Sequence, residues 1–232
     1  SRAYGLLRLA VNLGFSLGPL LAGLLIAGLG YNWLFIVNGI SCLFAALAFR
    51  LLLPPGRQEE GRPEKKVSKE GLSAYRNIPF ILFVVFLTLG AISFMQFFGS
   101  LPVYLKDHLD YTEAQIGILI AVNGIMIVAI EMPLIHKLGQ QFKALPLIGL
   151  GFVLIGIGYA LLHGASWMPI FALFFIVFIT FGEILSMPFA STYTAAIAPE
   201  NRRGQYMGLY NMSWAVAFIV APSLGLWWAE TY

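Results

Sequence analysis

The chain has 232 residues, of which 59% are hydrophobic and only 11% are charged. A soluble domain carries about 25% charged residues, so this composition excludes an ordinary water-soluble globule. Long apolar runs without polar alternation favour membrane-spanning helices over the strands of a barrel. The net charge of +3 does not point to nucleic acid, because no basic helix or aromatic-basic motif accompanies it. The single cysteine, Cys42, excludes an internal disulfide framework.

Seven segments are long enough to cross about 30 Å of hydrocarbon at about 1.5 Å per residue. We expect helices over residues 4–29, 31–53, 77–105, 112–137, 142–163, 167–197 and 203–229. A polar segment, residues 54–77, separates the second span from the third, and its proline, glycine and charge are typical of a linker. The other connections are short, so neighbouring spans should run antiparallel. The chain starts at Ser1 directly with span-like residues, and we therefore expect a fragment of a longer protein.

Positive charge is distributed unequally between the two sets of loops and ends. Thirteen of the fourteen Lys and Arg residues fall on one side of the seven-span arrangement, and only Lys106 falls on the other. Because cytoplasmic loops carry an excess of Lys and Arg, the first side is expected to be cytoplasmic. The start of the chain and the linker 54–77 would then be cytoplasmic, in a multi-pass protein of the cell (inner) membrane.

The first span returns in altered form at the seventh, 203 residues later. The two copies share the pairs Gly5 and Gly208, Leu6 and Leu209, Phe15 and Phe218, Pro19 and Pro222, and Leu21 and Leu224. Two spans that lie six helices apart and start on the same side indicate a parallel repeat about an axis along the membrane normal. We therefore expect twelve spans in the full protein, of which this chain would supply the fifth to the eleventh.

The small residues of the first span have a specific spacing. The positions that carry it are Gly5, Gly14, Gly18, Pro19, Ala22 and Gly23. This pattern resembles the antiporter motif of the major facilitator superfamily, in which a glycine replaces Ala22. In that family the motif is associated with drug:proton antiporters and related exporters, and its implied role is to bend the fifth helix and seal the two halves against leak.

The resemblance implies an all-α membrane protein built from two pseudo-symmetric six-helix bundles. Residues 1–53 would be the last two helices of the N-terminal bundle, 54–77 the linker, and 78–232 five of the six helices of the C-terminal bundle. A weaker loop motif of the same family, Gly-x-x-x-Asp-Arg/Lys-x-Gly, is matched only by Lys137 and Gly139. His136 stands where the motif has Asp, so the resemblance does not carry a charge-relay role to this loop.

The most informative ionisable side chain is Glu183, about midway along the span 167–197. A carboxyl group at the bilayer centre costs about 2.5–3.5 kcal/mol on insertion scales, and such groups are usually functional. Low-polarity surroundings also suit a group that takes up and releases a proton. We interpret Glu183 as a proton site or as a contact for a cationic substrate. The alternative is a structural carboxyl that is hydrogen-bonded to a neighbouring helix.

Two further charged residues lie within or near spans on the cytoplasmic side. Glu131 could pair with a basic residue or take part in gating, and its closeness to the interface favours a structural role. Arg8 either extends to the headgroups or faces the cavity and pairs with a carboxylate. The sequence leaves the two interpretations of Arg8 equal.

Several uncharged residues could line a cavity. The polar ones are Asn12, Gln96 and Asn123, each of which could equally be an interhelical hydrogen-bonding group worth about 0.6 kcal/mol. The aromatic ones are Phe94, Phe97, Phe98, Tyr104, Phe178, Phe181, Phe189 and Tyr193. The histidines do not cluster, so neither a metal site nor a cofactor is predicted. No nucleophile–base pair or phosphate-binding loop favours an enzyme.

Together these observations predict a proton-coupled secondary transporter similar to the drug:proton antiporter branch of the superfamily. Its partners would be protons, a small amphipathic molecule and the lipid bilayer, and the full-length protein would act as a monomer. One alternative is a proton-coupled nutrient symporter, which differs in the direction of transport. Another is a non-transporting receptor or scaffold, which would be favoured if Glu183 faced lipid and bulky apolar side chains filled the cavity.

Overall fold

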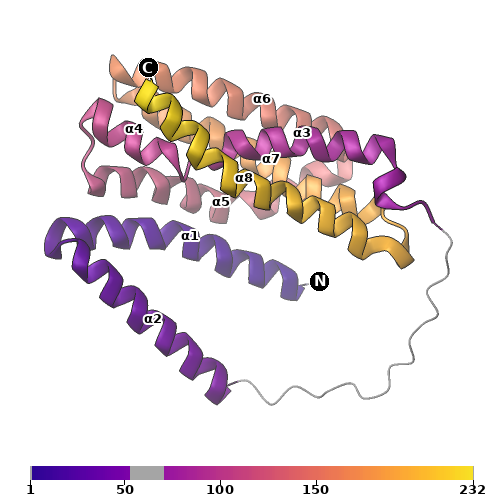
Figure 1. Ribbon diagram of the computed structural model, residues 1–232, viewed down its shortest axis with the longest axis horizontal. Helices are drawn as coiled ribbons and strands as arrows, with labels where there is room; N and C mark the ends of the chain where they lie inside the picture. The colour runs from indigo at the N-terminus through magenta and orange to yellow at the C-terminus, as the bar shows by residue number, and fades with distance from the viewer. Residues whose placement is uncertain (1, 53–70, 232) are drawn as a thin grey trace.

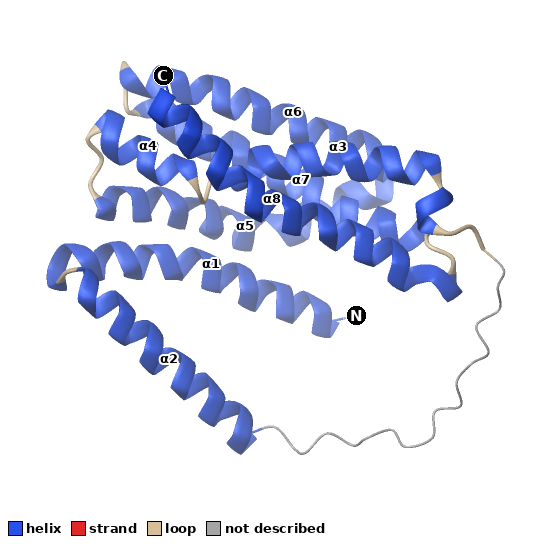
Figure 2. Cartoon of the chain, in the orientation of Figure 1, coloured by secondary structure: helices blue, strands red, loops and turns tan. Residues whose placement is uncertain are grey.

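The computed structural model describes residues 2–52 and 71–231, and every regular element among them is a helix (Figure 2). The long helices are α1 (Arg2–Leu29), α2 (Tyr31–Leu52), α3 (Ile78–Met95), α4 (Ser100–Leu109), α5 (Glu113–Gln141), α6 (Ala144–Leu162), α7 (Ile170–Ile197) and α8 (Arg203–Thr231). Short 3-10 turns occupy Ala74–Arg76, His163–Ser166 and Glu200–Arg202. The side chains of residues 2–9, 11, 12, 15, 16 and 228–231 lie outside this description, as does most of the expected linker.

The all-α membrane fold expected from the sequence is confirmed. Within the described residues, six segments are long and apolar enough to span a membrane, with α3 and α4 together counted as one segment, Ile78–Leu109. The described part of α1 adds a shorter apolar stretch, Leu17–Leu29. Helix α2 has no buried residue, and Leu43 and Phe44 on it are more than 70% exposed, as suits a surface in contact with hydrocarbon.

The third span differs from its prediction, because it is two helices and not one continuous helix over residues 77–105. Helix α3 ends at Met95, and α4 begins at Ser100 after a turn over Gln96–Gly99. A proline alone does not cause such a break, because four other helices continue through Pro19, Pro133, Pro188 and Pro222. Pro102 is compatible with a helix that starts at Ser100, since it has no backbone N–H to donate. As the third residue of α4 it needs no intrahelical partner. The Gln96 carbonyl accepts from the N–H groups of Ser100 and Leu101 instead, at 3.1 and 2.9 Å.

The helices form two groups, a hairpin of α1 and α2 and a larger group of α3 to α8 (Figure 1). Helix α1 lies along α5, which is its main contact with the larger group. Within that group the principal pairs are α6 with α7, α3 with α8, and α5 with α7. The turns and helix ends on one side of the molecule carry Arg76, Lys137, Lys143, Arg202 and Arg203. We call this the basic end; the opposite end holds the turns around residues 30, 110 and 167.

Among the described residues, glycine brings the backbones of two helix pairs close together. Between α6 and α7, a Cβ atom on Gly151 would lie 2.7 Å from the Gly182 carbonyl oxygen, and the reverse distance is also 2.7 Å. Between α1 and α5, a Cβ on Gly23 would lie 2.7 Å from the Glu113 carbonyl oxygen, and one on Gly117 would lie 2.9 Å from that of Pro19. We call these contacts the α6–α7 seam and the α1–α5 seam. The residue order of the second shows that α1 and α5 run antiparallel.

Candidate functional site

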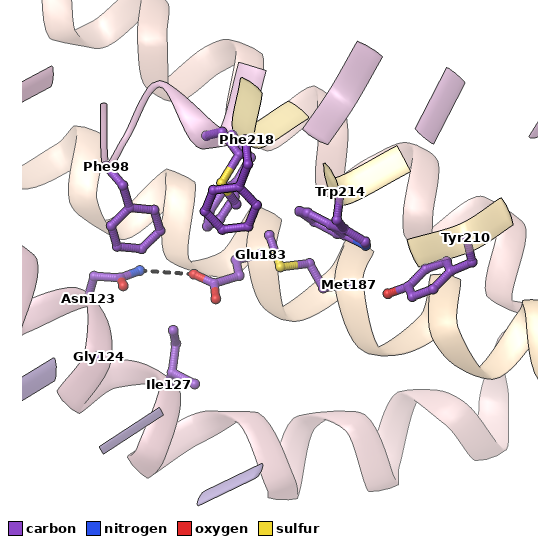
Figure 3. A pocket seen from close by; sticks show the side chains of 11 residues that line it. Phe98, Asn123, Gly124, Ile127, Glu183, Met187, Tyr210, Trp214 and Phe218 are labelled. Carbon is purple, nitrogen blue, oxygen red and sulfur yellow. Dashed lines mark hydrogen bonds between the residues drawn. The ribbon is translucent and has the colours of Figure 1, made fainter. Parts of the chain in front are cut away.

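Glu183 lies in the middle of α7, about 20 Å along the helix from either end. It is half-buried and lines a cavity of about 280 Å³, which we call the central cavity (Figure 3). Four helices and the turn after α3 supply the walls: Phe94, Met95, Phe98, Asn123, Gly124, Ile127, Glu183, Met187, Tyr210, Trp214 and Phe218. The carboxyl therefore faces a partly open space between helices at mid-depth.

A hydrogen-bond network joins α5 to α7 beside this carboxyl. The Asn123 amide nitrogen donates to Glu183 Oε2 at 3.3 Å and to Thr180 Oγ1 at 2.9 Å (Figure 3 draws the first bond). The Thr180 hydroxyl in turn donates to the Ile176 carbonyl at 2.6 Å, one turn back along α7. Asn123 is 4% exposed and Thr180 is fully buried. Because the amide can donate to both oxygens only with its nitrogen turned toward α7, the network fixes its orientation.

Aromatic rings form the opposite wall of the central cavity. Phe94 meets Phe98 edge-on at 5.8 Å and Trp214 at 6.5 Å, and Trp214 meets Tyr210 at 6.5 Å. Figure 3 shows Trp214 and Phe218 on the same side of the cavity as each other, close to Glu183. A ring face attracts a cation within about 6 Å of its centre, most strongly where water is absent. The cavity thus combines one carboxyl group with an apolar, aromatic wall.

Glu183 is the one acidic residue among the described residues that line the central cavity, and no Lys, Arg or His lies among them. Besides Glu183, the lining side chains with oxygen atoms are Asn123 and Tyr210. In the described part of the chain, no group of three or more His, Cys, Asp or Glu residues could hold a metal ion. The site can therefore bind a proton or a single positive charge, with room for an apolar body beside it.

The other residues singled out from the sequence lie elsewhere. Glu131 is buried on α5, two turns and about 12 Å beyond Asn123 toward the basic end, and does not line the central cavity. Gln96 lines a different cavity, between α3 and α6, where its side-chain oxygen accepts from Ser100. Lys137 and Gly139 are exposed near the end of α5. Three residues, Gly5, Arg8 and Asn12, lie outside the described side chains.

The motif residues of α1 meet α5 at the end opposite the basic end. Pro19, Ala22 and Gly23 line a second cavity there of about 470 Å³, which we call the end cavity. Lys106 and Glu113 form an ion pair of 2.8 Å at this cavity, and Tyr31 at the start of α2 lines it too. Gly23 packs against α5 backbone, whereas Gly14 and Gly18 face open space within the described residues. The close approach of α1 therefore depends on the last glycine of the motif.

Sequence reasoning did not single out Thr180, Met187, Tyr210, Trp214 or Phe218 as site residues. Of the aromatic residues that it named, Phe94 and Phe98 line the central cavity, but Phe97 and Phe189 are buried in the apolar core. A signal for Thr180 was available, because residues three apart on a helix share a face and Thr180 precedes Glu183 by three. Trp214 had no such signal, since α8 has no clear polar stripe.

Comparison with known families identifies the chain. The family model of the Major Facilitator Superfamily matches residues 1–222. The chain belongs to this superfamily. It is therefore an integral, multi-pass membrane protein of a family of transporters, as the resemblance in its first span predicted. No solved structure shows a significant match to the chain.

Three curated relatives in the superfamily have informative names. A Na(+), Li(+), K(+)/H(+) antiporter of Planococcus maritimus is 31% identical over 157 residues, covering 62% of this chain and 37% of the relative. The uncharacterised MFS-type transporter YttB of Bacillus subtilis is 24% identical, covering 97% and 56%. Multidrug resistance protein 1 of Bacillus subtilis is 26% identical, covering 97% and 57%. The chain spans about half the length of the curated relatives it matches.

Proposed function

We propose that the full-length protein is a proton-coupled secondary transporter that exports small amphipathic, drug-like molecules by alternating access. Glu183 is the group that holds either a proton or the positive charge of the substrate. The observation that carries this proposal is the position of Glu183: a carboxyl at mid-depth, in a cavity with aromatic walls, hydrogen-bonded to Asn123. The resemblance to antiporters and to a multidrug resistance protein supports it.

The chemistry of exchange follows from a single carboxyl group. An ionised carboxylate attracts a cation, while the protonated acid has no net charge and releases the cation readily. Aromatic rings such as Trp214 add attraction for a cation and bury the apolar part of an amphipathic molecule. Each turnover would then exchange one proton on Glu183 for one positive charge of substrate. A gradient of protons would in this way drive the substrate out of the cell.

The membrane arrangement that we propose follows the charge distribution. The basic end would face the cytoplasm of a cell (inner) membrane, because cytoplasmic loops are enriched in Lys and Arg. Helices α1 and α2 would belong to the N-terminal bundle, residues 54–77 would be the linker, and the helices from α3 onward would belong to the C-terminal bundle. The full-length protein would act as a monomer, with the two bundles rocking about the central cavity.

A second candidate is exchange of alkali cations for protons. The Planococcus maritimus relative is named for that activity, and Glu183, Asn123 and Tyr210 provide oxygen atoms on the central cavity. An alkali cation needs several oxygen ligands at once, and the lining is mostly apolar, which favours an organic cation. A nutrient symporter remains a third candidate, distinguished by import. Because Glu183 lines the cavity, the receptor or scaffold alternative has no support from its position.

The test is a transport assay on the full-length protein in inside-out membrane vesicles with an imposed pH gradient. One arm follows the fluorescent aromatic cation ethidium, and a second follows the pH change on addition of NaCl or KCl. We expect E183Q to abolish ethidium transport driven by the gradient, because the amide can neither ionise nor carry a proton. E113Q, at the end cavity, is the matched control and should retain most of the activity.

The outcomes separate the candidates. Unchanged gradient-driven transport in E183Q would falsify the proposal. A Glu183-dependent response to NaCl or KCl without any ethidium transport would replace organic cations with alkali cations as the substrate. Gradient-driven transport of a nutrient toward the cytoplasmic side, together with no ethidium export, would support the symporter.

A further inference from the structure

Asn123 lies beside Glu183 on the wall of the central cavity and is hydrogen-bonded to it. It is almost completely buried on α5, and its amide nitrogen faces two oxygen atoms of α7. The Thr180 hydroxyl has one proton, and that proton is donated to the Ile176 carbonyl at 2.6 Å. Toward Asn123, therefore, Thr180 can only accept. Both N–H groups of the amide are consequently directed to α7, one to a neutral oxygen and one to the carboxyl of Glu183.

The two bonds respond differently when Glu183 changes its protonation state. The bond to Thr180 joins two neutral groups and does not depend on pH. The bond to Glu183 is charge-assisted while the carboxylate is ionised, and such bonds are about twice as strong as bonds between neutral groups. Thr180 thus anchors the amide, and the second N–H group stabilises the ionised form of Glu183 in preference to its acid form.

We propose that Asn123, anchored by Thr180, is a positioning residue that sets the pH at which Glu183 exchanges its proton for substrate. This inference rests on the proposed function of Glu183. The helix that bears Asn123 is the one that also forms the α1–α5 seam, and Gly117 lies six residues, about 9 Å, before Asn123 on it. The hydrogen bond to Glu183 and the contact with α1 therefore lie on the same helix.

Two of the described residues that line the central cavity are titratable. Among the described residues that line the central cavity, the titratable ones are Glu183 on α7 and Tyr210 on α8, while α3 contributes Phe94 and Met95 only. On α5 itself the nearest acid is Glu131, two turns away. Removal of Asn123 therefore takes away a hydrogen-bond donor in direct contact with the Glu183 carboxyl.

The experiment measures the pH dependence of ethidium transport by the full-length protein in vesicles. N123L removes both amide donors and keeps a similar side-chain volume. We expect the pH of half-maximal transport to rise by about one unit, because a hydrogen bond to a charged group is worth about one pH unit or more. The readout is the position of the pH profile and not the maximal rate, because Asn123 also lines the central cavity. N123Q, which restores an amide, should move the profile back toward that of the wild type.

Thr180 provides a second variant, for which Thr194 is the matched control. T180V removes the anchor of the amide and should shift the profile in the same direction as N123L, by a smaller amount. Thr194, also buried on α7, makes the same kind of bond to the carbonyl four residues back but accepts from no amide of α5 in the described structure. T194V should therefore leave the profile unchanged.

The result that overturns the inference is a wild-type pH profile in N123L or T180V while E183Q is inactive. In that case the proposed function stands and only the role of Asn123 fails. If E183Q keeps its coupling, the proposed function itself fails. A loss of transport in N123L that N123Q does not restore, with a shift absent in the well-folded T180V, likewise overturns the inference, because it assigns Asn123 a merely structural role.

Discussion

At two helix crossings in the molecule, glycine lets the backbones approach closely, but the surroundings of the two crossings differ. In the α6–α7 seam, Gly151 and Gly182 each face the backbone of the other helix, and both residues are buried beside Ile155 and Ser186. In the α1–α5 seam, Gly23 and Gly117 also face backbone at under 3 Å, but the contact borders the end cavity and its exposed ion pair. Backbone proximity is thus nearly the same at both crossings.

All four glycines are buried, so the neighbouring end cavity is what distinguishes the α1–α5 seam from the α6–α7 seam. Between helices in a membrane, packing and hydrogen bonds drive association, so a seam buried on all sides is costly to open. A seam that borders a cavity with polar groups at its rim loses less when it separates. We therefore expect the α6–α7 seam to persist through transport and the α1–α5 seam to open and close. Substitutions in the two seams test this distinction.

The largest effect is expected for G182A. Its added Cβ would lie 2.6 Å from Ile155 Cγ1 and 2.7 Å from the Gly151 carbonyl oxygen, and backbone there cannot yield cheaply. Overpacking of this kind costs about 1–3 kcal/mol, and we expect a lower yield of folded full-length protein and a lower melting temperature. The measurement is thermal unfolding followed by size-exclusion chromatography. G156A, on α6 but facing open space, is the control, and equal stability of the two variants would contradict the prediction.

A smaller and different effect is expected for G117A. The substitution should leave the protein folded but disfavour the state in which α1 touches α5, by about 1–2 kcal/mol, or about tenfold in population. A cysteine in place of Ile120, which lines the end cavity, reports this change in a background where Cys42 is replaced by serine. Its labelling by a water-soluble maleimide should be about tenfold faster with G117A.

The control for G117A is G28A, because Gly28 lies on α1 in open space. Equal labelling rates in G117A and in the unaltered background would show that the seam does not separate. If G117A lowered the melting temperature as much as G182A does, the two seams would contribute equally to stability, contrary to the prediction.

The ion pair beside the α1–α5 seam should matter less. E113Q removes the charge that pairs with Lys106, whose side chain is 48% exposed, and exposed ion pairs contribute little in water. We expect transport to change by about twofold or less, and the difference to vanish at about 1 M salt, where charges are screened within about 3 Å. K106Q should match E113Q. A large effect that resists salt would indicate that the pair holds the seam closed.

The smallest effect is expected for G18A, within the motif itself. No described atom lies within 4 Å of a Cβ added there, so alanine should fit without displacement. Transport and melting temperature should equal those of the wild type. Strong inhibition would show that Gly18 contacts a part of the full-length protein that lies outside this chain, and would extend the comparison to a third seam.

The sequence was sufficient for the helices and for one key residue of the site, but not for the contacts around it. Glu183 stood out because a carboxyl in an apolar span is costly and therefore rare. Asn123 could be named, yet nothing in the sequence indicated that it faces Glu183, since the pairing depends on how α5 packs against α7. Thr180 escaped notice because buried threonines commonly bond to their own helix, as Thr194 does here.

The pattern of hydropathy also did not predict the break in the third span. Residues 96–99 are mostly apolar, so the span reads as continuous, and Pro102 did not by itself indicate an interruption, because other helices continue through proline. The motif on α1 was recognised by its spacing, but spacing could not tell which glycine makes a close contact. Gly23 does so and Gly18 does not, because Gly23 shares a helix face with Pro19, four residues before it, which contacts Gly117.

Because a turn separates α3 from α4, α4 can tilt about that turn as a short rigid helix. Lys106 lies seven residues beyond Gly99, a distance of about 10 Å along the helix. A tilt of about 10° at the turn would displace that position by about 2 Å, given the helical rise. With the side chains held fixed and the movement directed away from Glu113, the 2.8 Å contact would lengthen past the limit of about 4 Å for an ion pair. A small rotation about Gln96–Gly99, with both helices intact, is therefore enough to strain this ion pair while the apolar contacts of Leu101 and Leu105 hold α4 in the core.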